Sequence, residues 1–232
     1  MRIAKYISHS GYCSRRNAEK LINEKKVKIN SIVCQNLATK VSDQDTVKIN
    51  NHIITLEKNI RLWYFYKPVG IITSSKDPQG RKTVFDLLPK SYPRLITIGR
   101  LDINSEGLLL FTNNGDLARY FELPKNNLKR KYRVRVNGKV SKNKLLSLRQ
   151  GIRIDNISFK PIKANLEKQM KTNAWINMTL SEGKNREIRK ICSYFGWRVN
   201  KLIRINYGKF SLGNLKPGQI KEVYNHSYHN FK

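Results

Sequence analysis

The stretch GRLDINSEGLLLFT at residues 99–112 places a polar loop directly before an apolar run. The apolar run, Leu108–Thr112, predicts a buried strand, and Leu95–Ile98 predicts another strand just before the loop. A polar loop that carries Arg100 and Asp102 between two buried strands is a frequent location for catalytic groups. On these grounds alone a structural pair of the two residues is the better explanation. The loop therefore marks a candidate site without identifying its chemistry.

Outside this stretch, the expected strands and helices do not alternate regularly. Further strands are expected at residues 27–29, 32–34, 46–49, 62–66, 132–136, 176–180 and 199–205. Helices are expected over residues 3–7, 14–24, 83–88, 142–150 and 185–195. Because a doubly wound fold needs strands and helices in alternation, this order favours a mixed α+β fold.

The same pattern divides the chain into two domains. Residues 1–50 predict a small unit of helices and short strands. Residues 51–60 follow as a linker or an edge strand. The second domain is expected over residues 61–225, with a loose tail at residues 226–232.

Basic residues gather on the second helix of the first unit. Ser14 is a good N-cap for this helix, since its hydroxyl can accept from the backbone N–H groups of the first turn. Arg15, Arg16 and Lys20 can share one face of the helix. Exposure to solvent explains any one of them, whereas the cluster as a group favours phosphate binding.

The charge balance is the strongest signal in the composition of the 232-residue chain. Forty-six Lys and Arg residues stand against 16 Asp and Glu residues, for a net charge of +30. Such self-repulsion contributes nothing to folding, so the charge indicates a polyanionic partner. Nucleic acid fits best because each neutralised phosphate releases counterions. Ribosomal proteins, RNA-modifying enzymes and DNA-binding proteins all share this property, so charge alone does not choose among them.

Several protein classes are disfavoured. No run of about 18 apolar residues is present, so no transmembrane span is expected. Residues 1–18 are basic and rich in serine like a transit peptide, but their helical pattern favours folded structure. Cys13, Cys34 and Cys192 form no C-x-x-C pair, and the histidines complete no metal pattern with them. A reducing cytosol is expected, with neither a disulfide framework nor a metal site.

The string GRLDINSEGLLLFTNNGDLA, residues 99–118, is similar to the signature of pseudouridine synthases of the small-subunit synthase A family. Ser105 and Asn114 stand where that signature usually has Thr and Asp, and neither departure touches Asp102. Further similar segments are YKPVGIITSSKDPQGRKTVFDLLP (66–89), KYRVRVNG (131–138), SEGKNREIRKIC (181–192) and LIRINYGKFSLGNLKPG (202–218). Residues 1–50 resemble the S4 RNA-binding module that precedes the catalytic domain in this family. The resemblance therefore covers nearly the whole chain.

The resemblance implies which residues carry the reaction. Asp102 matches the catalytic aspartate, which acts either as a nucleophile or as the base that starts an elimination to a glycal. Tyr132 matches the active-site tyrosine, which is expected to stack on uracil and to move a proton. Arg189 matches the basic partner of the aspartate, and an arginine within about 4–6 Å favours the charged carboxylate. The reaction breaks and remakes a bond within one nucleoside, so no cofactor and no metal is implied.

The resemblance and the charge together predict the RNA contacts. The target uridine must leave its base stack to reach such a site, so the protein must hold the displaced backbone. The residues expected to bind RNA are Arg15, Arg16, Lys20, Lys28, Lys67, Arg81, Arg100, Lys184, Asn185 and Arg186.

The segment NREIR at residues 185–189 bears on the choice of substrate. It looks more like the large-subunit rRNA enzymes than the small-subunit one, so 23S rRNA is favoured over 16S rRNA. The expected partner is ribosomal RNA or a ribosomal precursor particle, bound by a monomer in the cytoplasm.

Three other functions fit parts of the sequence. A non-catalytic rRNA-binding or ribosome assembly factor fits the charge, but it has no need of Asp102, Tyr132 and Arg189 together. A glycosidase acting on nucleic acid would cleave a similar bond but release free base. A two-carboxylate hydrolase would use Asp102 with Glu106, although nothing in the sequence fixes their separation.

Overall fold

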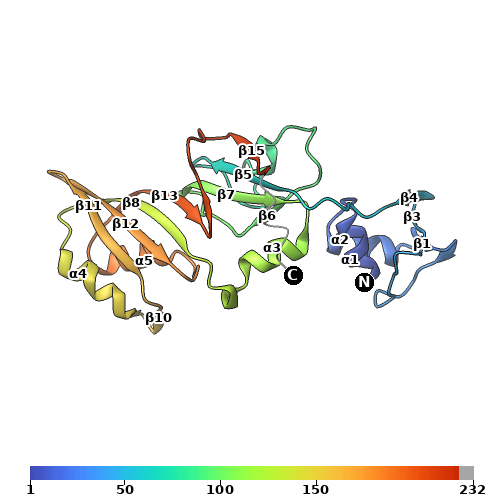
Figure 1. Cartoon of the computed structure of the whole chain (residues 1–232), viewed down its shortest axis with the longest axis horizontal. Coiled ribbons are helices and arrows are strands. Elements are labelled where there is room, and N and C mark those ends of the chain that lie inside the picture. The colour runs from blue at the N-terminus through green and yellow to red at the C-terminus, as the bar shows by residue number, and fades with distance from the viewer. Residues whose placement is uncertain (225–232) are drawn as a thin grey trace.

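The computed structural model describes residues 1–224, which form a small N-terminal unit and a larger sheet domain (Figure 1). The expected tail at residues 226–232 lies outside the described residues. The two units follow one another along the longest axis of the molecule, with the N-terminal unit at one end and strands β11 and β12 at the other. Among the helices at residues 1–224, none combines the length and the apolar character that a membrane span requires.

Two helices and a four-stranded antiparallel sheet share one core in the N-terminal unit. The helices are α1 (Ile3–His9) and α2 (Arg15–Asn23), and the sheet has the order β2-β1-β3-β4, with β1 Val27–Ile29, β2 Ile32–Val33, β3 Val47–Ile49 and β4 His52–Ile54. Ser14 caps α2 as expected, since its hydroxyl accepts from the Asn17 backbone N–H at 3.2 Å. Ile3, Ile22 and Val27 are fully buried in the core.

The boundary of this unit lies later than residue 50. Strand β4 pairs with β3 in the register Val47↔Ile54 and Ile49↔His52, so residues 52–54 belong to the small sheet. The edge strand considered for residues 51–60 is therefore present, and a linker can begin only after Ile54. The turn at Asn50-Asn51 explains the difference, because both residues adopt a positive φ and close a tight hairpin.

A mixed, mostly antiparallel sheet dominates the second domain. Its strands have the order β11-β12-β8-β13-β7-β5-β15, and β6 and β14 pair with β7 and β13. Among the pairs of named strands in this sheet, within residues 1–224, only β13–β7 is parallel. The bounds are β5 Leu62–Lys67, β6 Ile96–Ile98, β7 Glu106–Thr112, β8 Arg130–Asn137, β11 Lys163–Gln169, β12 Asn173–Leu180, β13 Val199–Tyr207, β14 Phe210–Ser211 and β15 Ile220–Glu222. The expected mixed α+β fold is confirmed.

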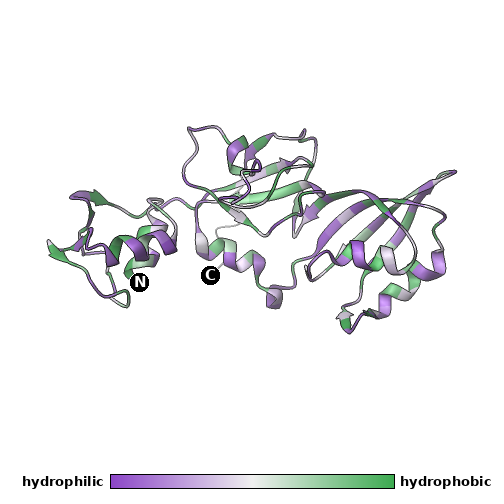
Figure 2. Ribbon diagram, turned by 180° about the vertical axis from the view of Figure 1, so that it is seen from behind, coloured by the Kyte–Doolittle hydropathy of each residue, from purple (hydrophilic) through white to green (hydrophobic). Residues whose placement is uncertain are grey.

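The helices of this domain cover different halves of the sheet (Figure 2). α5 (Glu187–Tyr194) and α4 (Lys142–Ser147) bury Ile191 and Leu145 in one core with Val134 of β8. α3 (Gly115–Glu122) buries Phe121 in a second core with Leu108 of β7. The remaining elements are β9 (Ile152–Ile154), β10 (Ile157–Phe159) and the 3-10 turns η1 (Phe85–Leu87), η2 (Pro124–Asn126) and η3 (Leu148–Gln150).

Most of the expected elements are present, with altered ends. The helix expected at residues 142–150 is divided into α4 and η3, and the one at 185–195 begins only at Glu187. The helix expected at residues 83–88 is a single 3-10 turn. The sequence patterns did not predict α3, β9, β10, β11, β14 and β15.

The two units contact one another through α1 and α3. The Lys5 Nζ lies 2.7 Å from a carboxylate oxygen of Asp116, and the His9 Nε2 lies 3.9 Å from the same oxygen. Burial lowers the pKa of His9, and the Asp116 carboxylate opposes that shift. The N-terminal unit is therefore joined to the helix that follows the loop–strand stretch 99–112.

Replacing Gly107 with Ala should strongly destabilise the protein. Gly107 has a φ of +103°, and an added Cβ would lie 2.4 Å from the carbonyl oxygen of Arg204 on the neighbouring strand. Gly196 is a matched control, since its φ is +79° but its Cβ would meet nothing within 4 Å. Gly196→Ala should cost about 1–2 kcal/mol for the backbone conformation alone, and Gly107→Ala at least about 2 kcal/mol more. Urea denaturation of both variants measures the difference, and equal losses would contradict the close approach.

Candidate active site

A cleft of about 800 Å³ lies over the middle of the sheet, where the polar loop at residues 99–105 faces the end of β12 and the start of α5. The structure brings six of the thirteen predicted site residues to its walls. Those that line it are Arg100, Asp102, Tyr132, Lys184, Asn185 and Arg186. Segments far apart in the sequence thus converge on Asp102, which is half-buried.

Two buried cations hold the backbone of the Asp102 loop. The Lys67 ammonium is fully buried and donates to the carbonyl oxygens of Ile103 at 3.4 Å and Ser105 at 2.8 Å. The Arg204 guanidinium, only 2% exposed, donates to the carbonyl oxygens of Leu108 at 2.7 Å and Arg100 at 3.4 Å. The loop is therefore tied on both sides of Asp102 to β5 and β13, the strands that carry these cations.

The full burial of Lys67 does not favour the contact with RNA that the sequence predicts for it. Its side chain at the end of β5 points into the protein and also donates to the Pro68 carbonyl oxygen at 2.9 Å. Burial lowers the pKa of Lys67 to about 8, while the charges of Asp102 and Glu106 oppose that shift. Lys67 therefore holds the backbone beside Asp102 and places a positive charge near its carboxylate.

Arg204 is a site residue that the sequence reading did not single out. It lies on β13 opposite Tyr132 of β8, and its side chain lines the cleft. Its Nη2 is buried without a hydrogen-bond partner among the described residues. A buried donor without a partner is costly, so an acceptor that reached this atom from the cleft would stabilise the site.

Arg189 reaches the same loop from α5. Its Nη2 donates to the carbonyl oxygen of Asn104 at 2.7 Å. Within residues 1–224 it forms no ion pair with Asp102 inside 4.0 Å, so the direct pairing expected from the sequence is absent here. Burial and the charge of Arg186 lower the pKa of Arg189, and the charge of Asp102 raises it. The guanidinium therefore lies within electrostatic reach of the carboxylate while it holds the loop.

Tyr132 presents a ring and a hydroxyl to the cleft. It is half-buried on β8 and packs against the cores on both sides of the cleft. In the part of the chain that the structure describes, its hydroxyl has no hydrogen-bond partner. The hydroxyl and the exposed part of the ring can therefore contact a molecule that enters beside Asp102.

The start of α5 carries a buried carboxyl group. Glu187 is 4% exposed, and its Oε2 accepts from the Lys184 backbone N–H at 3.0 Å. Its Oε1 has no partner among the described residues, and burial raises the pKa of Glu187 to about 7. The Lys184 ammonium is engaged with the Ser158 carbonyl oxygen and, at 3.3 Å, with Glu182. Lys184 must release these partners before it can bind RNA.

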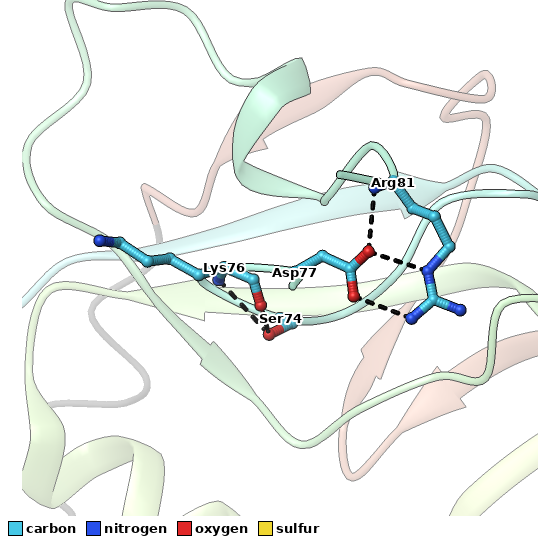
Figure 3. A network of polar contacts seen from close by, with 4 residues as sticks. All are labelled: Ser74, Lys76, Asp77 and Arg81. Atoms are coloured by element: carbon cyan, nitrogen blue, oxygen red, sulfur yellow. Dashed lines mark hydrogen bonds and ion pairs between the residues drawn. The ribbon is translucent and has the colours of Figure 1, made fainter. Parts of the chain in front are cut away.

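The other predicted contacts lie away from the cleft. Figure 3 shows Arg81 paired with Asp77, at 2.9 Å from its Nε and 2.8 Å from its Nη2. The Arg81 guanidinium lowers the pKa of Asp77 to about 2. The remaining predicted residues belong to the N-terminal unit. Arg15, Arg16 and Lys20 are exposed on α2, and Lys28 donates to Asn51 at 3.2 Å.

The two-carboxylate hydrolase finds no support in this geometry. Glu106 lies outside the cleft lining, accepts from the Tyr66 hydroxyl at 3.0 Å and pairs with Lys201 at 3.2 Å. It is therefore not placed as the second carboxylate of a hydrolase. The described residues contain no group of three His, Cys, Asp or Glu side chains placed to hold a metal ion.

Two family models match this chain. A model described as RNA pseudouridylate synthase matches residues 61–194, and one described as S4 domain matches residues 1–47. An uncharacterized RNA pseudouridine synthase of Rickettsia felis is 54% identical over 97% of both chains. The ribosomal large subunit pseudouridine synthase B of Bacillus subtilis is 37% identical over 97% of this chain and 93% of its own. A solved pseudouridylate synthase is 24% identical and aligns with a TM-score of 0.69 over 99% of this chain and 98% of its own. This similarity shows a shared fold.

Glu187→Gln should change how stability depends on pH. A carboxyl group whose pKa rises from 4.5 to about 7 on folding stabilises the folded state below pH 4.5. That contribution is lost as the pH rises through 7, because the group must then ionise in a buried place. Glutamine cannot ionise, so between pH 5 and 8 the variant should gain about 2–3 kcal/mol in free energy of unfolding relative to the wild type. Urea denaturation across this range tests it, with Glu57→Gln, at an exposed glutamate, as the control. Parallel pH profiles for wild type and Glu187→Gln would contradict the burial of an ionisable group.

Proposed function

The chain belongs to the RNA pseudouridylate synthase family, and from this we propose that it converts a specific uridine of ribosomal RNA to pseudouridine, with 23S rRNA favoured over 16S rRNA. The activity of an RNA pseudouridine synthase follows from membership. The choice of 23S rRNA is supported by relatives 37–39% identical that are named as large-subunit synthases B. The cytoplasm is the compartment proposed for this reaction, and a monomer the active form.

The observation that carries the proposal is the position of Asp102 in a cleft that could admit a flipped nucleoside. In the reaction, the N1–C1′ bond of the target uridine breaks and a C5–C1′ bond forms. C5 loses its proton, and N1 gains one. The Asp102 carboxylate would act either by attack on the ribose or by removing a proton to start the elimination to a glycal. Both routes need the carboxylate ionised and close to the ribose.

The surrounding cations support such a role. Lys67, Arg189 and Arg204 fix the backbone carbonyl oxygens of the loop and add positive charge around Asp102. A preformed arrangement of such groups needs no reorganisation during the reaction. We assign Arg189 and Tyr132 to the catalytic group with Asp102, Tyr132 by stacking on the uracil and by moving a proton.

RNA binding is proposed for two surfaces. The module at residues 1–47 would bind structured RNA through Arg15, Arg16, Lys20 and Lys28, whose charges suit phosphate contacts. Around the cleft, the exposed residues Arg100, Asn185 and Arg186 are placed to hold the backbone beside the flipped uridine, as is Lys184 once released. Arg81 can contribute only if RNA competes with Asp77 for its guanidinium.

Asp102→Asn should abolish product while leaving RNA affinity within a few fold. The amide keeps the shape of the side chain but can act neither as a base nor as a carboxylate nucleophile. Tritium released from C5-labelled uridine in separate 23S and 16S transcripts measures turnover, and filter binding measures affinity. Release from the 23S transcript alone, lost in the variant, is expected. Equal turnover by the variant would contradict the assignment of Asp102, and release from the 16S transcript alone would contradict the choice of substrate.

Arg189→Gln should slow the reaction by about a hundredfold or more, because the loop loses a cationic donor next to the carboxylate. Lys190→Gln removes the same charge one residue away on α5 and serves as the control. The rate is measured in a single turnover at saturating RNA, so that weaker binding does not contribute. Equal rates for the two variants would show that Arg189 acts only as general surface charge.

A further inference from the structure

A second cavity, of about 540 Å³, lies beside the cleft and has no role in the reaction described above. Three cations surround it, from the segment before β8, from η3 and from the start of β11. The polar side chains in its lining are Asn127, Lys129, Arg149, Lys163, Thr179 and Ser181. Among the described residues, no carboxylate belongs to this lining.

The three cations of this cavity are uncompensated. Lys129, Arg149 and Lys163 are exposed, and none of them has a hydrogen bond or an ion pair to another side chain within residues 1–224. Elsewhere in the domain, Arg61, Arg81 and Arg133 each pair with a carboxylate. Three unpaired cations around one cavity repel one another, so the arrangement favours an anion between them.

The cavity is adjacent to the catalytic cleft along two chain segments. Leu180 lines both cavities. In two segments, consecutive residues line different cavities. Lys129 and Ser181 line the second one, whereas Arg130 and Glu182 line the cleft. The two cavities are therefore neighbours at the end of β12.

We propose that this second cavity is a phosphate-binding pocket for the RNA strand that flanks the target uridine. Flipping a nucleotide displaces the backbone on both sides of it, and that backbone needs fixed cations. Lys129, Lys163 and the forked guanidinium of Arg149 would bind phosphate oxygens. The hydroxyls of Thr179 and Ser181 add neutral donors. This inference rests on the proposed function for the identity of the strand, but the pocket itself is defined by its charges and shape.

The test is the salt dependence of binding to a 23S rRNA transcript, measured in the Asp102→Asn background so that no turnover occurs. The triple variant Lys129→Gln, Arg149→Gln, Lys163→Gln should bind about tenfold more weakly at moderate salt. Its plot of log affinity against log salt should lose about 2 in slope, since each single-strand phosphate contact contributes about 0.7. The charge-conserving variant Lys129→Arg, Arg149→Lys, Lys163→Arg should keep most of the slope, which separates lost contacts from lost structure.

A matched control removes three exposed cations of the same domain that line neither cavity, in Lys139→Gln, Lys142→Gln, Lys171→Gln. It should lose clearly less slope than the pocket variant. Equal slopes for the two triple variants would overturn the proposal, as would loss of slope in the charge-conserving variant. Binding is measured without catalysis, so the two proposals can fail separately. If the wild type formed no pseudouridine, the proposed function would be contradicted, and the binding result would still test the pocket.

Discussion

The Asp102 loop depends on hydrogen bonds from buried cations to backbone carbonyl oxygens. The ammonium of Lys67 is fully buried and can remain there only because the carbonyl oxygens of Pro68, Ile103 and Ser105 replace its water. Arg204 makes the corresponding contacts from β13, and Arg189 adds one from α5. Removing any one cation would leave carbonyl oxygens without these donors. The conformation of the loop therefore depends on the strands and the helix that carry the cations. Gly107 completes this constraint by letting β7 approach the backbone of Arg204.

The fold was predictable where side-chain patterns are strong. Strands β8 and β12 alternate apolar and polar residues, and Ser14 marks the start of α2. Edge strand β11, KANLEKQ, is mostly exposed and polar, so its pairing with β12 leaves little trace in the sequence. Helix α3 was missed because its first residue is a glycine and only eight residues show the apolar pattern. Tertiary pairing, rather than local preference, forms these elements.

The site was predictable in part, since the matched motifs named Asp102 and Tyr132, and both line the cleft. The direction in which a cation points was not predictable. Lys67 follows an aromatic strand and could equally have faced phosphate, but it is turned inward by the carbonyl oxygens of the loop. Arg204 interrupts the apolar residues of β13 in a pattern that also fits an exposed basic residue. Only the pairing of β13 with β7 and β8 shows that its guanidinium lies beneath the loop.

The most direct measurement is a map of pseudouridine in the rRNA of cells that lack the protein. The cells are complemented either with the wild type or with Asp102→Asn. Loss of one modified position in 23S rRNA, restored by the wild type and not by the variant, is the result that this account predicts. An unchanged map, or restoration by the variant, would contradict the claim that Asp102 carries out the isomerisation of a ribosomal uridine.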